Sequence, residues 1–328
     1  MTNYIHETLR PHQESTFNVL SPFDGMSCLQ IALNRLGMRY DNYYASEIDK
    51  YAIQVTQHNY PDTIQLGDIT KWQEWDLPKI DLITGGSPCQ GFSYAGKGLN
   101  FDDPRSKLFF VFEDIVKHYK PRYWLLENVV MRQEWQDVIS QRLGIKPIMI
   151  NSALVSAQNR KRLYWTNWNF GQPEDRGLVL ADIVENGFAD RQKSFCLDAN
   201  YYKGGNLKRY FEKNGRQLVF KKNYAQIINN QGNQSQSMRI YYLASKSPTI
   251  VSHVGGFKQK IFIGRSDFRN LTPLECERLQ TVPDNYTLVL DKNGKQKVSN
   301  TQRYKMLGNG WTVDAICHIL SHMDKHNV

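Results

Sequence analysis

The residue best placed for chemistry in this sequence is a cysteine that follows an apolar run. Residues 81–87 read Asp-Leu-Ile-Thr-Gly-Gly-Ser, and Pro88 and Cys89 come directly after them. An apolar run closed by glycine and proline is typical of a buried strand and a tight turn. Ligands of open α/β sheets bind at the carboxyl ends of the strands. Cys89 is therefore either a small buried side chain or a nucleophile, and the polar, glycine-rich loop 90–98 favours the nucleophile.

A carboxylate follows a second apolar run. Residues 123–126 read Tyr-Trp-Leu-Leu and lead directly into Glu127 and Asn128. A carboxylate in apolar surroundings is costly unless it is paired or protonated. Glu127 is thus a candidate general acid, and a buried salt bridge is the structural alternative.

Two arginines alternate just before the apolar residues 163–165. Side chains in a strand point to opposite faces in turn, so Arg160 and Arg162 are expected on the same side. Two guanidinium groups on one face could bind an anion or a phosphate. A solvated edge strand is the other interpretation.

The first 70 residues have the order of elements typical of a nucleotide-binding βαβ unit. A strand over 17–21 leads into a turn over 22–25, and a helix follows with Leu29, Ala32, Leu33 and Leu36 on one face and Gly37 at its end. The next strand, 43–46, ends in Glu47. A carboxylate about 20 residues after the glycine turn can accept hydrogen bonds from both ribose hydroxyls of an adenosine cofactor.

A third strand, 64–66, carries a second carboxylate at its end. Asp68 could accept a hydrogen bond from an adenine amino group, and Ile69 could cover the ring. For Glu47 and Asp68 alike, the alternative is a solvated loop carboxylate. The repeated pattern of strand end plus carboxylate favours the cofactor interpretation.

Composition narrows the class of protein. The chain has 328 residues, 41 Lys and Arg against 32 Asp and Glu, and a net charge of +9, which is compatible with a polyanionic partner. Five cysteines without paired spacing argue against a disulfide framework and against a zinc site, and they fit a reducing compartment. We find no signal peptide and no apolar run of membrane length.

The pattern changes near residue 170, where short apolar pieces are broken by Gly and Asn. Residues 191–222 hold nine Lys or Arg against two acids, interleaved with aromatic residues that include Phe195, Tyr201, Tyr202, Tyr210 and Phe211. Basic residues among aromatics suit nucleic-acid contact, and a solvated surface is the alternative.

The section from Leu271 onward predicts two helices and a turn. Thr272 is expected to cap a short helix, with Pro273 and Glu275 in its first turn. Residues 307–311 are expected to form a turn, and residues 313–320 an amphipathic helix that closes the fold.

Together these pieces resemble the DNA cytosine-C5 methyltransferase family, from Val19 to Leu320, through six motifs in the family's order. Phe23-Asp24-Gly25 is similar to its cofactor turn, Gly86-Ser87-Pro88-Cys89-Gln90 to its nucleophile motif, Glu127-Asn128-Val129 to its glutamate motif, and Gln158-x-Arg160-x-Arg162 to its paired arginines. Leu271-Thr272-Pro273-x-Glu275-x-x-Arg278-Leu279-Gln280 and Gly308-Asn309 are similar to its two late motifs.

The resemblance combines two branches and has two departures. The cofactor turn and residues 125–130 are most similar to the de novo branch, and residues 90–93 and 308–309 to the bacterial and phage enzymes. Ser27-Cys28 stands where bacterial members usually carry a glycine pair. Residues between 168 and 265 match no recognition domain that we can name.

The resemblance implies an α/β fold: a Rossmann-like class I S-adenosylmethionine-dependent methyltransferase domain with a smaller inserted target-recognition domain. We expect the catalytic domain over 1–168, the recognition domain over 169–268, and a C-terminal segment, 269–328, that returns to the catalytic domain. It further implies a bacterial or phage-encoded, cytoplasmic monomer that acts on double-stranded DNA, with a separate cognate restriction endonuclease as a possible partner.

The resemblance also assigns roles to individual residues, and it implies no metal. The expected catalytic residues are Cys89, Glu127, Arg160 and Arg162; the expected contacts to S-adenosylmethionine and its product S-adenosylhomocysteine are Phe23, Asp24, Gly25, Glu47, Ile48, Asp68, Ile69, Asn309 and Trp311; the expected DNA contacts are Gln90, Ser93, Lys97 and Arg105.

Two rival functions share most of these motifs. A tRNA cytosine-5 methyltransferase uses the same catalytic groups, but that branch usually carries a Cys-Phe-Thr tripeptide that this chain lacks. A catalytically silent DNA-binding homologue predicts the loss of a catalytic residue. All four are present, so DNA methylation is the leading interpretation.

Overall fold

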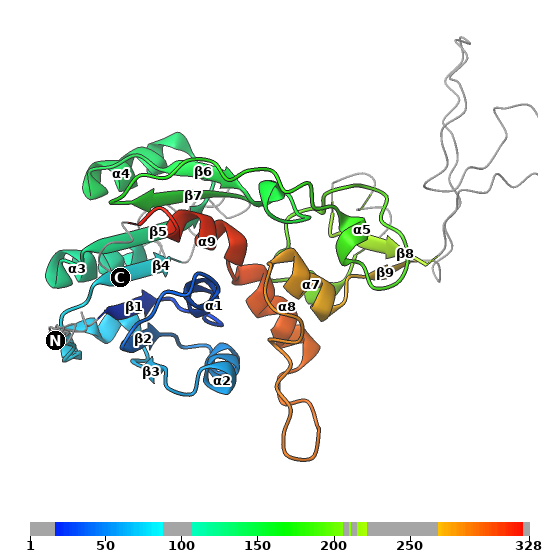
Figure 1. Ribbon diagram of the computed structural model, residues 1–328, viewed down its shortest axis with the longest axis horizontal. Coiled ribbons are helices and arrows are strands. Elements are labelled where there is room, and N and C mark those ends of the chain that lie inside the picture. The colour runs from blue at the N-terminus through cyan, green and yellow to red at the C-terminus, as the bar shows by residue number, and fades with distance from the viewer. Residues whose placement is uncertain (1–16, 88–106, 206–209, 211–214, 222–267, 324–328) are drawn as a thin grey trace, which may run out of the picture.

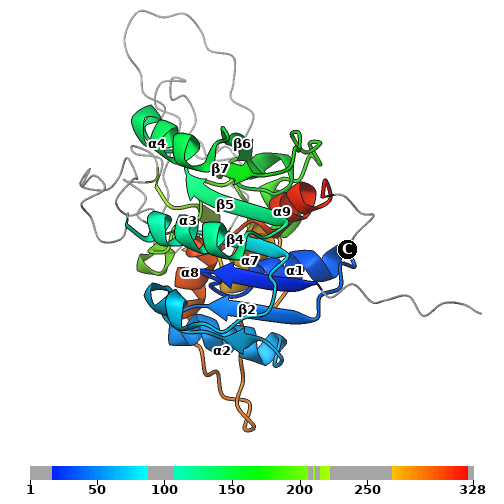
Figure 2. The ribbon, with the colours of Figure 1, turned by 90° about the vertical axis from the view of Figure 1, so that its left-hand side faces the viewer.

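A seven-stranded sheet forms the centre of the computed structural model, which describes residues 17–87, 107–205, 210, 215–221 and 268–323. The strand order is β3-β2-β1-β4-β5-β7-β6, and the pairs from β3 to β5 are parallel, whereas β7 runs antiparallel to both of its neighbours. Figure 2 shows β2, β4, β5 and β7 in this order. The strands are β1 (Asn18–Pro22), β2 (Asn42–Ser46), β3 (Ile64–Gln65), β4 (Leu82–Gly86), β5 (Tyr123–Val129), β6 (Ile148–Asn151) and β7 (Lys161–Thr166).

Helices cover both faces of this sheet, because its strands are apolar on both sides. Neighbouring strand residues alternate between two cores: Val19, Leu82 and Leu125 belong to the core that includes α1 and α9, whereas Leu20, Ile83 and Leu126 pack with α3 and α4. The helices of this part are α1 (Cys28–Arg35), α2 (Lys50–Asn59), α3 (Lys107–Tyr119), α4 (Gln133–Leu143) and α9 (Val313–Leu320), with the 3₁₀ turns η1 (Ile69–Glu74) and η2 (Ser152–Leu154).

A second, two-stranded sheet lies at one end of the molecule, beyond the seven-stranded sheet (Figure 1). It pairs β8 (Leu218–Phe220) with β9 (Phe268–Asn270), and α5 (Leu180–Ile183) and η3 (Tyr201–Lys203) belong to the same part of the chain. Its small core is built on Tyr210, Leu218 and Phe220. The chain then returns through α7 (Pro273–Leu279) and α8 (Asn300–Asn309) to α9. The division into domains at residues 168 and 268 stays a prediction.

Helix α7 begins as the sequence predicts. Thr272 caps it by accepting the amide hydrogen of Glu275, the Glu275 side chain accepts in return from the Thr272 amide, and Pro273 occupies the first turn. This reciprocal cap satisfies amides that the helix itself cannot bond.

The turn predicted over residues 307–311 is wrong in its first half. Residues 307–309 belong to α8, and the chain leaves the helix only at Gly310. Gly308 is required by close packing and not by a turn, because a Cβ atom at this position would lie 2.2 Å from the carbonyl carbon of Asp198. Glycine thus allows a close approach between α8 and the segment before η3.

Helix α9 packs on helix α1. Helix α9 lies against α1, and Asp314 pairs with Arg35 of α1 and with Arg176. Within the described residues, no helix has the length and apolar character needed to cross a membrane. The same residues contain no group of three or more His, Cys, Asp or Glu arranged to hold a metal ion.

Candidate active site

A cavity of about 560 Å³ opens at the carboxyl ends of β1, β2, β4 and β5. Its volume lies in the range of small-molecule and cofactor sites. All nine residues predicted to contact the cofactor line it, and so do Glu127, Arg160 and Arg162. The residues that the sequence proposes for two different roles therefore share one cavity.

The turn after β1 is tied to the end of β2. Phe23, Gly25 and Ser27 all have positive φ, so the turn is tight. The Gly25 amide donates to Glu47 Oε2 at 2.8 Å, and Glu47 Oε1 accepts from the amides of Ile48 and Asp49 at 2.7 and 2.8 Å. These bonds fix the Glu47 carboxylate at the edge where the sequence places a ribose.

Asp24 forms a polar cluster on the floor of the cavity. Its carboxylate accepts from the Tyr43 hydroxyl at 2.6 Å and from the Ser27 hydroxyl. Burial raises the pKa of Asp24 to about 6, against these two hydrogen bonds, which lower it. The Ser27 hydroxyl donates one of these bonds, and the glycine that is usual at this position has no side chain that could do so.

The outer part of the cavity has an apolar and an acidic side. Ile48 is 77% exposed, whereas Ile69 is only 6% exposed and packs into the core below the cavity. Asp68 is exposed and caps η1, since its Oδ1 accepts from the Thr70 amide at 2.9 Å. This cap holds the pKa of Asp68 below its usual value.

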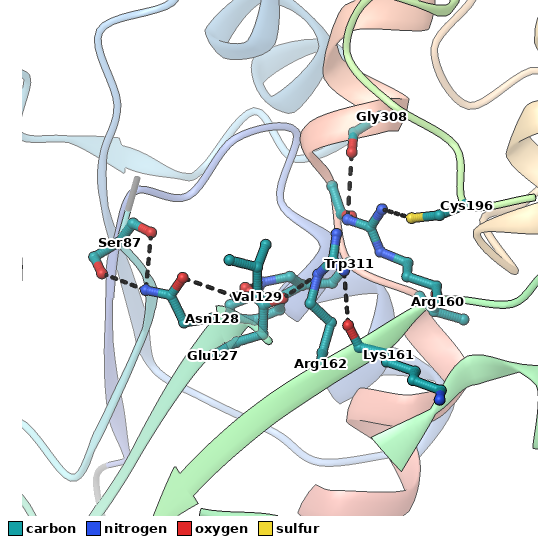
Figure 3. Close-up of polar contacts among 12 residues, drawn as sticks. Ser87, Glu127, Asn128, Val129, Arg160, Lys161, Arg162, Cys196, Gly308 and Trp311 are labelled. Carbon is teal, nitrogen blue, oxygen red and sulfur yellow. Dashed lines mark hydrogen bonds and ion pairs between the residues drawn. The ribbon is translucent and has the colours of Figure 1, made fainter. Parts of the chain in front are cut away.

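Glu127 lies within β5 rather than after it, because the pairing with β7 continues to Val129. Its side chain is a salt-bridge partner at the cavity wall: Arg162 Nε lies 3.0 Å from Oε1, and the Trp311 indole Nε1 donates to Oε2 at 3.1 Å (Figure 3). The pairing expected for a buried carboxylate is therefore present, and it faces the cavity.

The two arginines line the same cavity but have different partners. Arg160 is buried, and it donates to the carbonyls of Leu197 at 3.0 Å and Gly310 at 2.8 Å. A further bond reaches the Gly308 carbonyl at 3.3 Å. Arg160 thus binds the turn before α9 and the segment before η3, whereas Arg162 contacts the glutamate.

The predicted nucleophile lies outside the described residues, as do the four predicted DNA contacts Gln90, Ser93, Lys97 and Arg105. Ser87, two residues before Cys89, is described and buried, and Asn128 Nδ2 donates to its hydroxyl at 3.0 Å. Among the described residues, the thiol that lines the cavity is that of Cys28, and burial raises its pKa to about 12, so it stays protonated.

The basic, aromatic stretch after residue 191 is partly internal. Tyr201 and Tyr210 are buried, so their rings are not available to stack on bases. Arg191 pairs with Asp190 and lies over the rings of Phe195 and Tyr210. The nucleic-acid interpretation is therefore wrong for the rings of Tyr201 and Tyr210, of which the first packs in the main core and the second in the small core around β8.

The comparison with known families decides the chain's membership. The sequence model of the C-5 cytosine-specific DNA methylases matches residues 17–325. The chain belongs to this family. It is a DNA cytosine-5 methyltransferase of the bacterial and phage type, and the family's reaction depends on S-adenosylmethionine.

Individual relatives agree with the family. The type II methyltransferase M1.ScrFI of Lactococcus lactis subsp. cremoris is 29% identical over 303 residues, which cover 85% of this chain and 71% of the relative. M.HhaI of Haemophilus parahaemolyticus is 25% identical, with 95% of each protein covered. The Entamoeba histolytica methyltransferase EhMeth superposes with a TM-score of 0.65 at 14% identity, over 94% of this chain and 98% of that one, and it supports the fold.

Sequence reasoning missed the side chains that hold this methyltransferase site together. Gln158 Nε2 donates to the Leu279 carbonyl at 2.7 Å and to Gln280 Oε1 at 2.8 Å, and Gln280 in turn donates to the Leu307 carbonyl at 2.6 Å. Both glutamines belong to the recognised motifs, but no local pattern shows that they meet. Tyr43 gave no signal beyond that of a strand residue.

Proposed function

We propose that this methyltransferase modifies cytosine at C5 in short sequences of double-stranded DNA, through a flipped-out base and a covalent bond between Cys89 and C6. The observation that carries the proposal is the shared cavity. It brings the candidate cofactor residues within one space with Glu127 and Arg162, at the sheet edge where β4 ends at Gly86, and Cys89 follows this strand three residues later in the sequence.

The thiol is needed because C5 of cytosine is a poor nucleophile. Attack of the Cys89 thiolate on C6 forms an S–C6 bond and moves the ring electrons to C5, which splits one difficult step into two easier ones. C5 then takes the methyl group, and the sulfonium carbon–sulfur electron pair stays on the cofactor sulfur. Loss of the C5 proton to a base returns electrons to the ring and expels the Cys89 thiolate.

Glu127 acts on the charge that this attack places on the ring. A carboxyl group at N3 can share a proton with the base and disperse the charge. Arg162 holds this carboxyl at 3.0 Å and faces the same cavity, so it supplies a positive charge beside the reacting base. Arg160 acts less directly, through the backbone carbonyls that it binds.

The residues present fit S-adenosylmethionine. The cavity has the volume for a molecule of this size, an exposed isoleucine on its outer side, and carboxylates at the ends of β1 and β2. When bound, this cofactor supplies the methyl group on a positively charged sulfur. Its proposed site is lined by the nine residues expected from the sequence: Phe23, Asp24, Gly25, Glu47, Ile48, Asp68, Ile69, Asn309 and Trp311.

The target cytosine has to leave the duplex, because C5 and C6 are not reachable in the stack. We assign Gln90, Ser93, Lys97 and Arg105 to contact with the DNA around the flipped base. The part between residues 169 and 268 is proposed to read the sequence, and 1–168 with 269–328 to perform catalysis. We further propose a cytoplasmic monomer, with a separate restriction endonuclease as its cognate partner.

The experiment that tests this function treats mixed-sequence DNA with the protein and S-adenosylmethionine and maps protected cytosines by bisulfite-type sequencing. Protection within one short motif supports sequence-specific methylation. Protection in all contexts contradicts the specificity, and methylation of tRNA alone, in a parallel tube, contradicts the DNA target. Cys89→Ala is expected to abolish methylation while DNA binding, measured by a mobility shift, is retained.

A further inference from the structure

The side chain of Trp311 links two parts of the site that are distant in sequence. Trp311 lies between α8 and α9, and its indole reaches the ends of β4 and β5. There Nε1 donates a hydrogen bond to Glu127 Oε2 at 3.1 Å (Figure 3). Glu127 is 8% exposed, so this bond forms away from bulk water, where a bond to a carboxylate is strongest.

Two donors from different elements thus fix the plane of the Glu127 carboxyl. Arg162 of β7 contacts Oε1, and Trp311 contacts Oε2. A carboxylate has about four acceptor positions, so each oxygen keeps one for a base. Rotation of the carboxyl about its last bond would break both contacts, so the two donors together define one orientation.

The backbone of Trp311 is itself held firmly. The carbonyl of the preceding Gly310 accepts from Arg160 Nη2 at 2.8 Å and from Gln280 Nε2 at 3.1 Å. The Cys28 thiol contacts the Trp311 carbonyl at 3.8 Å. The indole therefore extends from a fixed point, which is the condition for it to position another side chain.

We propose that Trp311 is a positioning residue, which orients the Glu127 carboxyl through its indole N–H before the cytosine enters. This inference rests on the proposed catalytic role of Glu127. Any contact of the indole ring with the cofactor is a separate property, since it uses the ring face and not the N–H. The indole N–H is therefore proposed to contribute to the chemical step, whereas any contribution to cofactor affinity comes from the ring.

The test is Trp311→Phe, which keeps an aromatic ring and removes the N–H. The loss of a hydrogen bond to a charged group lowers a rate or an affinity by about tenfold or more, so we expect kcat to fall about tenfold. The KM for DNA, and the Kd for S-adenosylmethionine measured by calorimetry, should stay within about twofold of the wild type. A tenfold rise in that Kd with an unchanged kcat would overturn the proposal.

The matched control is Trp168→Phe. It removes an indole N–H bond of similar length, 3.0 Å to the carbonyl of Ile319, outside the cavity. We expect its kcat to equal that of the wild type. An equal loss of kcat in both variants would show that the effect of Trp311→Phe is a general loss of packing, and this outcome also overturns the proposal.

A double-mutant cycle separates this inference from the proposed function. If Trp311 acts through Glu127, Trp311→Phe should change kcat less than twofold when Glu127→Gln is already present. A full tenfold loss in that background overturns the positioning role. If Glu127→Gln alone leaves kcat unchanged, the catalytic role of Glu127 fails instead, and the positioning role, which rests on it, fails with it.

Discussion

Two neighbouring glycines at the end of β4 provide a sharp test of how the site is built. Successive residues of a strand face opposite sides of the sheet. A Cβ atom added at Gly85 would lie 2.9 Å from the ring of Phe112, a fully buried core residue. A Cβ atom added at Gly86 would lie 3.0 Å from both Glu127 Oε2 and Trp311 Nε1. The same substitution therefore enters the core at one position and the candidate site at the next.

The expected effects follow from these contacts. Gly85→Ala overpacks the core and should lower the free energy of unfolding by about 1–3 kcal/mol. Gly86→Ala places a Cβ atom against the Glu127 carboxyl and the Trp311 indole, which must shift by a few tenths of an ångström. The hydrogen bond between these two groups is then lost, and this loss, about 1.5–3 kcal/mol, should lower kcat about 10- to 100-fold.

The assay measures both quantities for both variants. Urea unfolding gives stability, and methyl transfer to DNA at saturating cofactor gives kcat per folded molecule. Gly85→Ala should lose stability with kcat retained, and Gly86→Ala should lose kcat with little change in stability. If the two variants lose kcat equally, or if Gly86→Ala remains fully active, the assignment of Glu127 and Trp311 to the reaction is refuted.

Three further substitutions test the cavity. Burial raises the pKa of Asp24 from 3.8 to about 6, so the wild type loses stability as the pH rises through this window. Asp24→Asn should therefore be more stable than the wild type at pH 7.5 by up to about 3 kcal/mol. Urea unfolding should show that this gain disappears near pH 4. Glu47→Gln should weaken cofactor binding about tenfold in calorimetry, since a charged hydrogen-bond acceptor is lost, and an unchanged Kd would exclude Glu47 from the cofactor site. Arg160→Met removes the Arg160 bonds to the buried carbonyls of Leu197 and Gly308 and leaves the Gly310 carbonyl with Gln280 alone, so it should lower the free energy of unfolding by about 3 kcal/mol in the same urea assay, whereas an unaffected variant would contradict its role at the turn.

Local patterns in the sequence predicted the elements of the fold well. The strands of the sheet agree with the expected apolar runs to within one to three residues, because apolar residues that face a core on both sides leave a clear signal. The closing helix spans Val313–Leu320 as expected. The cap at Thr272 was predictable because Pro273 and Glu275 act on the same turn.

Contacts between distant residues were not predictable in this way. Gly308 has the signal of a turn, and only the close approach of Asp198 explains why it lies inside a helix. The spacing of Arg160 and Arg162 predicted that they lie on one side of a strand; Arg160 lies just before β7, both line the cavity, and the spacing could not show that one binds carbonyls and the other a carboxylate. The bond between Glu127 and Trp311 joins residues 184 positions apart, so no local pattern contains it.

The position of α9 has a consequence for how the chain folds during synthesis. Helix α9 covers α1, which is synthesised long before it, and the turn before α9 supplies Gly310 and Trp311 to the cavity. Contacts between such distant segments form late, because the intervening chain must be closed into a loop first. A nascent chain that ends before this turn lacks one wall of the cavity, so catalytic competence should arise only after the turn and α9 have been synthesised.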